Sequence, residues 1–236
     1  MSTMRSIAVV KNAKLAMSDV NKLIDVLVGV DGYSIFDISF ESKDHKEYIE
    51  GKLEKINKDQ KGNLPSLLDF VQKYISKPGW VSFSYNSPEG FDFAITIKNE
   101  MDFFEISLDA SLLTQKTYDE MIKLVKMTYL ELGCSFGYYF EAETFAHHKL
   151  FPDIKEICRT NEVKRLYYVN FWNSKIVKNI GKERIAAVKT LEPSCNVETL
   201  KDGSILLALP LELHNESFVG FHAGESIANH LHLKYF

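Results

Sequence analysis

Two acids and a lysine in the second half of the chain have types and spacing suited to metal-dependent chemistry. Pro152-Asp153 is followed by Glu162-Val163-Lys164, which matches a PD…ExK pattern. In that pattern two carboxylates hold a metal ion and a lysine polarises the phosphate under attack. However, the gap between the two parts is short, and Asp153 stands where a helical turn is predicted to open. A charged surface loop is the preferred interpretation, and a metal-dependent, nuclease-like hydrolase is the alternative.

Histidines form two further groups that could ligate a metal ion. His147 and His148 are adjacent, so in a regular helix or strand their side chains point in different directions. His222 and Glu225 are three residues apart on a predicted helix, and His230 and His232 follow. This spacing supplies two ligands on one face but places no third. Solvated or core-edge histidines are therefore expected, although these terminal histidines stay within the hydrolase alternative.

Motifs for nucleotide binding and for serine hydrolysis are incomplete. Gly181-Lys182 resembles the end of a phosphate-binding loop, but Ile176 stands where the loop needs its first glycine. The sequence also has no G-x-S-x-G element, which would present a nucleophilic serine on a sharp turn. We therefore expect no catalytic residues, no metal and no cofactor.

Two carboxylates and a tyrosine share one face of a predicted strand. Tyr139, Glu141 and Glu143 are spaced two apart, so their side chains point the same way. Acid–base catalysis would need environments that separate the two pKa values. A hydrated strand face is the simplest interpretation, since charged side chains are normally exposed. A third interpretation is a partner-binding patch, in which the acids attract a basic cleft and the ring supplies contact area.

Composition limits the classes of partner. The chain has 236 residues, 45% of them apolar and 25% charged, with a formal charge of −4. These are ordinary globular values, and the charge offers no footprint for nucleic acid. Cys134, Cys158 and Cys195 are odd in number and widely spaced, which favours free thiols in a reducing compartment. No targeting segment or membrane span is expected, so the predicted location is the cytoplasm.

The elements that must position these residues follow from periodicity. The clearest signal is three alternating strands over Trp80–Tyr85, Phe91–Lys98 and Phe103–Leu108. Their short connections allow only antiparallel neighbours. Further strands are predicted over Arg5–Val10, Ile35–Glu41, Cys134–Phe145 and Leu166–Trp172, and as a hairpin around Asp202-Gly203. Helices are predicted over Asp19–Val28, Lys43–Lys61, from Asn63 to Pro78, and over Thr117–Leu132, Lys175–Ile180 and Asn215–Leu233.

The predicted fold class is α+β. A mostly antiparallel sheet contains the central three-strand meander, and helices pack on it. We expect one domain over 1–236, with two packed halves, 1–133 and 134–236, as the alternative.

One stretch of the chain resembles a known class of proteins. Residues 166–185 read LYYVNFWNSKIVKNIGKERI: an aromatic strand, an Asn, an aromatic pair and a helix that ends at Gly-Lys-Glu-Arg. This is similar to a stretch in α+β immunity proteins of bacterial polymorphic-toxin and type VI secretion systems. The resemblance implies an inhibitor that binds a cognate toxin and blocks its active site. It carries over no catalytic residues. A strand, a cap and a glycine stop would also account for the pattern.

The sequence therefore predicts a non-enzymatic, immunity-type protein that binds a toxin acting in the cytosol. Its expected partner is a protein, with neither nucleic acid nor membrane involved, and nothing in the sequence indicates an oligomeric state. A metal-dependent hydrolase and a small-ligand-binding module, with the aromatic sheet lining its pocket, are the alternatives.

Overall fold

The structure is a computed structural model of the whole chain. It describes residues 4–42, 46–48, 56–57, 59, 62–88, 90–98, 103–141, 146–211 and 222–235. The backbone forms two compact units, Met1–Gly133 and Cys134–Phe236. Both units combine helices with antiparallel strands, so the predicted α+β class is confirmed. The expectation of one domain over 1–236 stays a prediction. Among the described residues, no helix combines the length and apolar character needed to span a bilayer.

The first unit, which we call unit 1, contains a six-stranded sheet with the order β3-β2-β4-β5-β6-β1. Every neighbouring pair is antiparallel. The predicted meander is confirmed as β4, β5 and β6. In chain order the elements are β1 (Met4–Val10), α1 (Met17–Val28), β2 (Ser34–Glu41), β3 (Lys46–Tyr48), α2 (Leu64–Tyr74), β4 (Trp80–Asn86), β5 (Asp92–Lys98), β6 (Phe103–Asp109), the 3₁₀ turn η2 (Ala110–Leu112) and α3 (Gln115–Leu132).

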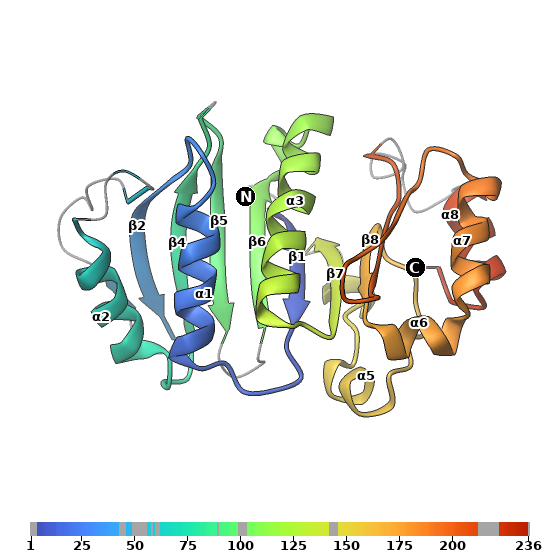
Figure 1. Ribbon diagram of the computed structural model, residues 1–236, viewed down its shortest axis with the longest axis horizontal. Coiled ribbons are helices and arrows are strands. Elements are labelled where there is room, and N and C mark those ends of the chain that lie inside the picture. The colour runs from blue at the N-terminus through green and yellow to red at the C-terminus, as the bar shows by residue number, and fades with distance from the viewer. Residues whose placement is uncertain are drawn as a thin grey trace. The chain divides into compact units, whose positions relative to one another are not determined.

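One face of this sheet forms the core of unit 1. Val81, Phe83 and Tyr85 of β4 are buried, and β5 buries alternate residues in the same way. Figure 1 shows α1, α2 and α3 on the same side of the sheet. Because side chains alternate along a strand, this arrangement turns every second residue toward the face that these helices do not cover.

Two features near β2 differ from the simple pattern of the sequence. The helix predicted over Lys43–Lys61 is wrong, because Lys46–Tyr48 form strand β3 beside β2 and Ile56 bridges Ile35. Of residues 49–61, the structure describes only 56, 57 and 59. The strand predicted over Ile35–Glu41 forms as β2 (Ser34–Glu41), but the alternation of its side chains is interrupted. A register shift between Ile35 and Asp37 puts Ile35 in the core and leaves Phe36 half-buried.

The second unit, unit 2, contains a four-stranded sheet with the order β7-β8-β10-β9. All three neighbouring pairs are antiparallel. In chain order the elements are β7 (Phe136–Glu141), α5 (Ile154–Thr160), β8 (Val169–Trp172), α6 (Ser174–Ile180), α7 (Lys182–Leu191), β9 (Asn196–Thr199), β10 (Ile205–Ala208) and α8 (His222–Leu231). The helix predicted over Asn215–Leu233 is thus described only as α8, since 212–221 lie outside the described residues.

The stretch 166–185 uses its two central asparagines for local structure. Asn170 is fully buried: its Oδ1 accepts a bond of 3.0 Å from the Tyr167 amide, and its Nδ2 donates to the Tyr167 carbonyl at 2.6 Å. Asn173 caps α6, because its Oδ1 accepts from the amides of Lys175 and Ile176. These two side chains therefore shape the strand and the helix start.

Candidate functional site

The face of the unit 1 sheet opposite the helices carries mostly polar residues, many of them small. The strand register aligns Ser39, Ser82, Thr96 and Glu105 in one row across β2, β4, β5 and β6. A second row contains Ser84, Ala94, Ser107 and Ser6. We call this surface the hydroxyl face, defined by Ser6, Ser39, Ser82, Ser84, Thr96 and Ser107 together with Lys98 and Glu105.

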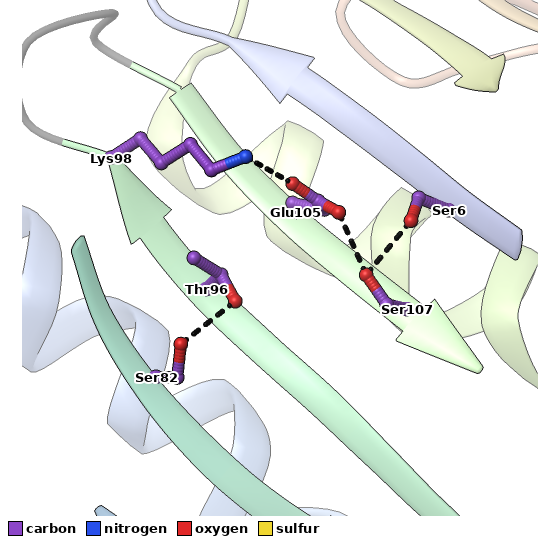
Figure 2. Close-up of polar contacts among 6 residues, drawn as sticks. All are labelled: Ser6, Ser82, Thr96, Lys98, Glu105 and Ser107. Carbon is purple, nitrogen blue, oxygen red and sulfur yellow. Dashed lines mark hydrogen bonds and ion pairs between the residues drawn. The ribbon is translucent and has the colours of Figure 1, made fainter. Parts of the chain in front are cut away.

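Hydrogen bonds link the side chains of the hydroxyl face across the strands (Figure 2). Ser82 Oγ lies 3.0 Å from Thr96 Oγ1. Lys98 Nζ donates to one oxygen of Glu105 at 2.9 Å, and Ser107 Oγ donates to the other at 2.8 Å. Glu105 is only 8% exposed, and its carboxylate is stabilised because both of its oxygens accept hydrogen bonds.

The chain of hydroxyls continues to β1. Ser6 Oγ lies 2.8 Å from Ser107 Oγ, and both side chains are buried. By contrast, Ser82, Ser84 and Thr96 are half-buried, and the indole of Trp80 beside them is 36% exposed. Because these three side chains are short, they project little from the sheet, and the Trp80 ring stands beside them. Such a surface suits contact with another protein surface.

The hydroxyl face is not equipped for nucleophilic catalysis. A serine nucleophile needs a neighbouring base to take its proton. Ser82 hydrogen-bonds with Thr96 and Ser6 with Ser107, and Ser107 donates to Glu105, whose second oxygen already accepts from Lys98. In the part of the chain that the structure describes, no histidine is hydrogen-bonded to them.

The predicted acidic patch is only partly on the surface. Tyr139 is 0% exposed and packs edge-on against Tyr168, with ring centroids 5.4 Å apart. The alternation in β7 predicted one hydrated face, but its residues 136–140 are all buried. Tyr139 is therefore a core side chain, and the patch loses its aromatic member. Glu141 is half-buried and Glu143 lies outside the described residues, so their binding role stays a prediction.

Unit 2 contains a pocket that gathers all three residues of the PD…ExK pattern. Its volume is about 160 Å³, and Asp153, Glu162 and Lys164 line it. The pocket lies between the start of α5 and the segment that leads to β8. Its apolar wall is formed by Phe151, Ile157, Val163 and Tyr167.

Two of those three residues already have structural partners. Asp153 Oδ1 accepts a 2.9 Å bond from the Glu156 amide and so caps α5, as its sequence context predicted. Lys164 Nζ lies 3.4 Å from Glu156 Oε1. Within the described ranges, no three side chains of His, Cys, Asp or Glu are grouped so that they could hold a metal ion. The spacing that matched a nuclease pattern is thus accounted for by a helix cap and an ion pair.

Among the residues whose side chains the structure describes, the histidines form no group that could hold a metal ion. The exposed rings of His147 and His148 contact each other, with Nδ1 and Nε2 3.4 Å apart. In α8, His230 Nε2 lies 2.9 Å from the Arg184 carbonyl oxygen, so this nitrogen is used in packing α8 near α7.

The three cysteines are free thiols, and Cys134 and Cys195 are buried. Burial, together with the nearby Glu192 carboxylate, raises the pKa of Cys195 to about 12. A thiol that stays protonated is a poor nucleophile and a poor metal ligand. Cys195 is therefore a core residue of unit 2.

Comparison with solved structures shows a likeness in fold. The fold resembles that of a Pseudomonas aeruginosa T6SS protein, PA0821. The two structures align over 98% of this chain and 73% of the other, with a TM-score of 0.50 and 12% sequence identity. At that identity the likeness shows a shared fold alone. No family model matches the sequence, and no curated protein matches it.

The hydroxyl face was missed in the sequence, although a signal for it was present. The polar positions of the predicted meander include Ser82, Ser84, Thr96, Glu105 and Ser107. Alternation alone marks such positions as hydrated. Apart from Glu105, these side chains are short, and their size rather than their polarity is the signal for a flat surface that runs across several strands.

Proposed function

We propose that this chain is a non-enzymatic, immunity-type protein that binds and inhibits a cognate toxin of a type VI secretion system in the cytosol. The observation that carries this proposal is the fold likeness to a T6SS protein, which extends over 98% of the chain. The resemblance of residues 166–185 to immunity proteins of such systems supports it from the sequence.

The hydroxyl face is the surface that we assign to the toxin. Its accessible part is flat because Ser82, Ser84 and Thr96 are short. Trp80 stands in the adjacent row, opposite Lys98, and supplies an aromatic group of the kind enriched at protein interfaces. Hydroxyls can donate or accept, so they adapt to polar groups of a partner at little entropic cost.

Protection of cells is the direct test. Toxin domains encoded in neighbouring genes would each be expressed with and without this chain in a host that lacks it. We expect restored growth with one of them, and a one-to-one complex of that pair by size-exclusion chromatography with light scattering. If this chain protects against none of those toxins, the proposal is wrong.

Arginine substitutions on the hydroxyl face test the assigned surface. Ser82→Arg and Thr96→Arg place a long charged side chain on the shallow face, and each should weaken toxin binding at least about tenfold. Ser66→Arg is the matched control, because Ser66 is exposed on α2 on the helical side of unit 1. All three variants should keep the wild-type circular dichroism spectrum. Folded variants that bind the toxin as tightly as wild type would place the interface elsewhere.

Metal analysis tests the non-enzymatic part of the proposal. Protein purified without chelators should contain less than about 0.1 metal ion per chain, and EDTA should leave its melting temperature unchanged. Stoichiometric metal, with a fall in melting temperature after chelation, would favour the hydrolase alternative.

A further inference from the structure

Two charged side chains that line the pocket of unit 2 are not paired with the other lining residues. Asp153 is used as the cap of α5, and Lys164 pairs with Glu156. Two charged side chains of the lining then remain, the Glu162 carboxylate and the Arg165 guanidinium. Within the described residues, neither group has an ion pair or a side-chain hydrogen bond.

These two groups differ in their access to solvent. Glu162 is exposed at the rim, whereas Arg165 is half-buried. Burial raises the pKa of the Tyr167 phenol, and the nearby Arg165 guanidinium opposes that rise only in part. The phenol therefore stays neutral, and its hydroxyl donates to the Leu150 carbonyl at 3.3 Å. Tyr167 thus offers no negative charge to neutralise Arg165.

The apolar wall lies beside this pair of charges. Ile157 and Tyr167 are buried, and Phe151, the most exposed of the wall residues, is 45% exposed. The volume of about 160 Å³ is close to that of cavities of about 150 Å³ that hold one benzene ring. The pocket has room for one small apolar group with polar ends. A nucleotide or a folded peptide is too large for it.

We propose that this pocket binds a small zwitterion, a free α-amino acid with an apolar side chain. The guanidinium of Arg165 pairs with the carboxylate of the amino acid, a geometry that favours two parallel hydrogen bonds. The carboxylate of Glu162 pairs with the ammonium group of the amino acid. The apolar side chain of the amino acid packs on Ile157, Val163 and Tyr167. This site lies outside the hydroxyl face and does not depend on the proposed toxin.

Titration of the full-length chain with leucine and its blocked forms tests the ligand. Isothermal titration calorimetry should show one leucine bound per chain. N-acetyl-leucine lacks the ammonium and leucinamide lacks the carboxylate, so each should bind at least about tenfold more weakly. Glycine, which has no side chain to reach the apolar wall, should also bind more weakly. If neither leucine nor any other apolar amino acid binds, or if both blocked forms bind as well as leucine, the proposal is wrong.

Substitutions within the pocket test the site. Arg165→Met and Glu162→Gln should each weaken leucine binding at least about tenfold. Arg159→Met is the matched control, since Arg159 is exposed in the last turn of α5 and does not line the pocket. Glu162→Gln changes an exposed residue and should keep the wild-type melting temperature, so its result stands even if Arg165→Met unfolds the protein. Unchanged leucine affinity in folded Glu162→Gln would overturn the proposed site. Protection against the toxin should be unaffected by either variant, which separates this test from that of the proposed function.

Discussion

Two buried threonines on one helix should respond with opposite sign to the same substitution. Thr117 and Thr128 both lie in α3 and are both 0% exposed. Thr117 Oγ1 accepts from the Thr114 amide at 2.8 Å and donates to the Leu112 carbonyl at 2.7 Å. In the described part of the chain, Thr128 Oγ1 has no hydrogen-bond partner. Valine has nearly the shape of threonine, so each substitution removes chiefly the hydroxyl.

The magnitudes follow from these contacts. A buried hydroxyl without a partner costs about 1–3 kcal/mol, so Thr128→Val should raise the free energy of unfolding by about 1 kcal/mol. Thr117→Val leaves a backbone amide and a carbonyl without partners at the start of α3. It should lower the free energy of unfolding by about 2 kcal/mol. The two variants should therefore differ by about 3 kcal/mol.

Urea unfolding followed by far-ultraviolet circular dichroism measures both values. The slope of the free energy with urea should be the same in the two variants, so that a change in the midpoint reports stability. A destabilised Thr128→Val, or two variants that lie within about 0.5 kcal/mol of each other, would refute the reasoning. The first result would mean that the Thr128 hydroxyl has a partner in solution, such as the carbonyl one turn earlier in α3.

Three further predictions concern buried charge, burial of a thiol and backbone strain. Lys98→Met should destabilise the protein by about 2 kcal/mol, because it leaves the buried Glu105 carboxylate without its cation. Adding Glu105→Gln should recover part of that loss in a double-mutant cycle, and an additive double variant would contradict this. Because burial raises its pKa to about 12, the Cys195 thiol stays protonated in the folded state at a pH where the thiol of the unfolded chain has already ionised. The stability that it contributes is therefore present below about pH 9 and is lost as the pH rises toward 12. Cys195→Ala should flatten this alkaline decline in melting temperature, and an unchanged decline would count against the burial argument. Gly79→Ala should lower the free energy of unfolding by at least about 2 kcal/mol more than Gly203→Ala does. A Cβ at Gly79 would lie 2.5 Å from a backbone oxygen, whereas one at Gly203 meets nothing closer than 3.9 Å. Equal thermal destabilisation by the two substitutions would disprove this.

Local physical chemistry was sufficient to predict many of the elements. The meander β4–β5–β6 follows from alternation and short turns, both of which involve neighbouring residues. The end of α3 follows from Gly133, which adopts φ 62°, a conformation that glycine reaches at low cost. The hairpin of β9 and β10 follows from Asp202-Gly203, with Gly203 at φ 82°.

Elements that depend on a distant partner were predicted poorly. Residues 46–48 have the mixed charges of a surface helix, yet they form β3 because the edge of β2 offers them backbone hydrogen bonds. The shift at Phe36 follows the same rule, since the register of β2 is set by its pairing with β4. Neither partner is visible within a short window of sequence.

The sequence by itself determined the fold class, most helix ends, the meander and the free cysteines, because each depends on residues close along the chain. Only the tertiary structure decided which polar residues share a surface. Burial of Tyr139 required cover on both faces of β7, which alternation cannot indicate. The pocket forms because the fold places Asp153, at the start of α5, near Glu162 and Lys164. Glu156 contacts two of these three residues, since its amide donates to Asp153 and its carboxylate pairs with Lys164. The hydroxyl face needed the register of five strands, because a shift of one residue in any strand would turn its hydroxyls into the core.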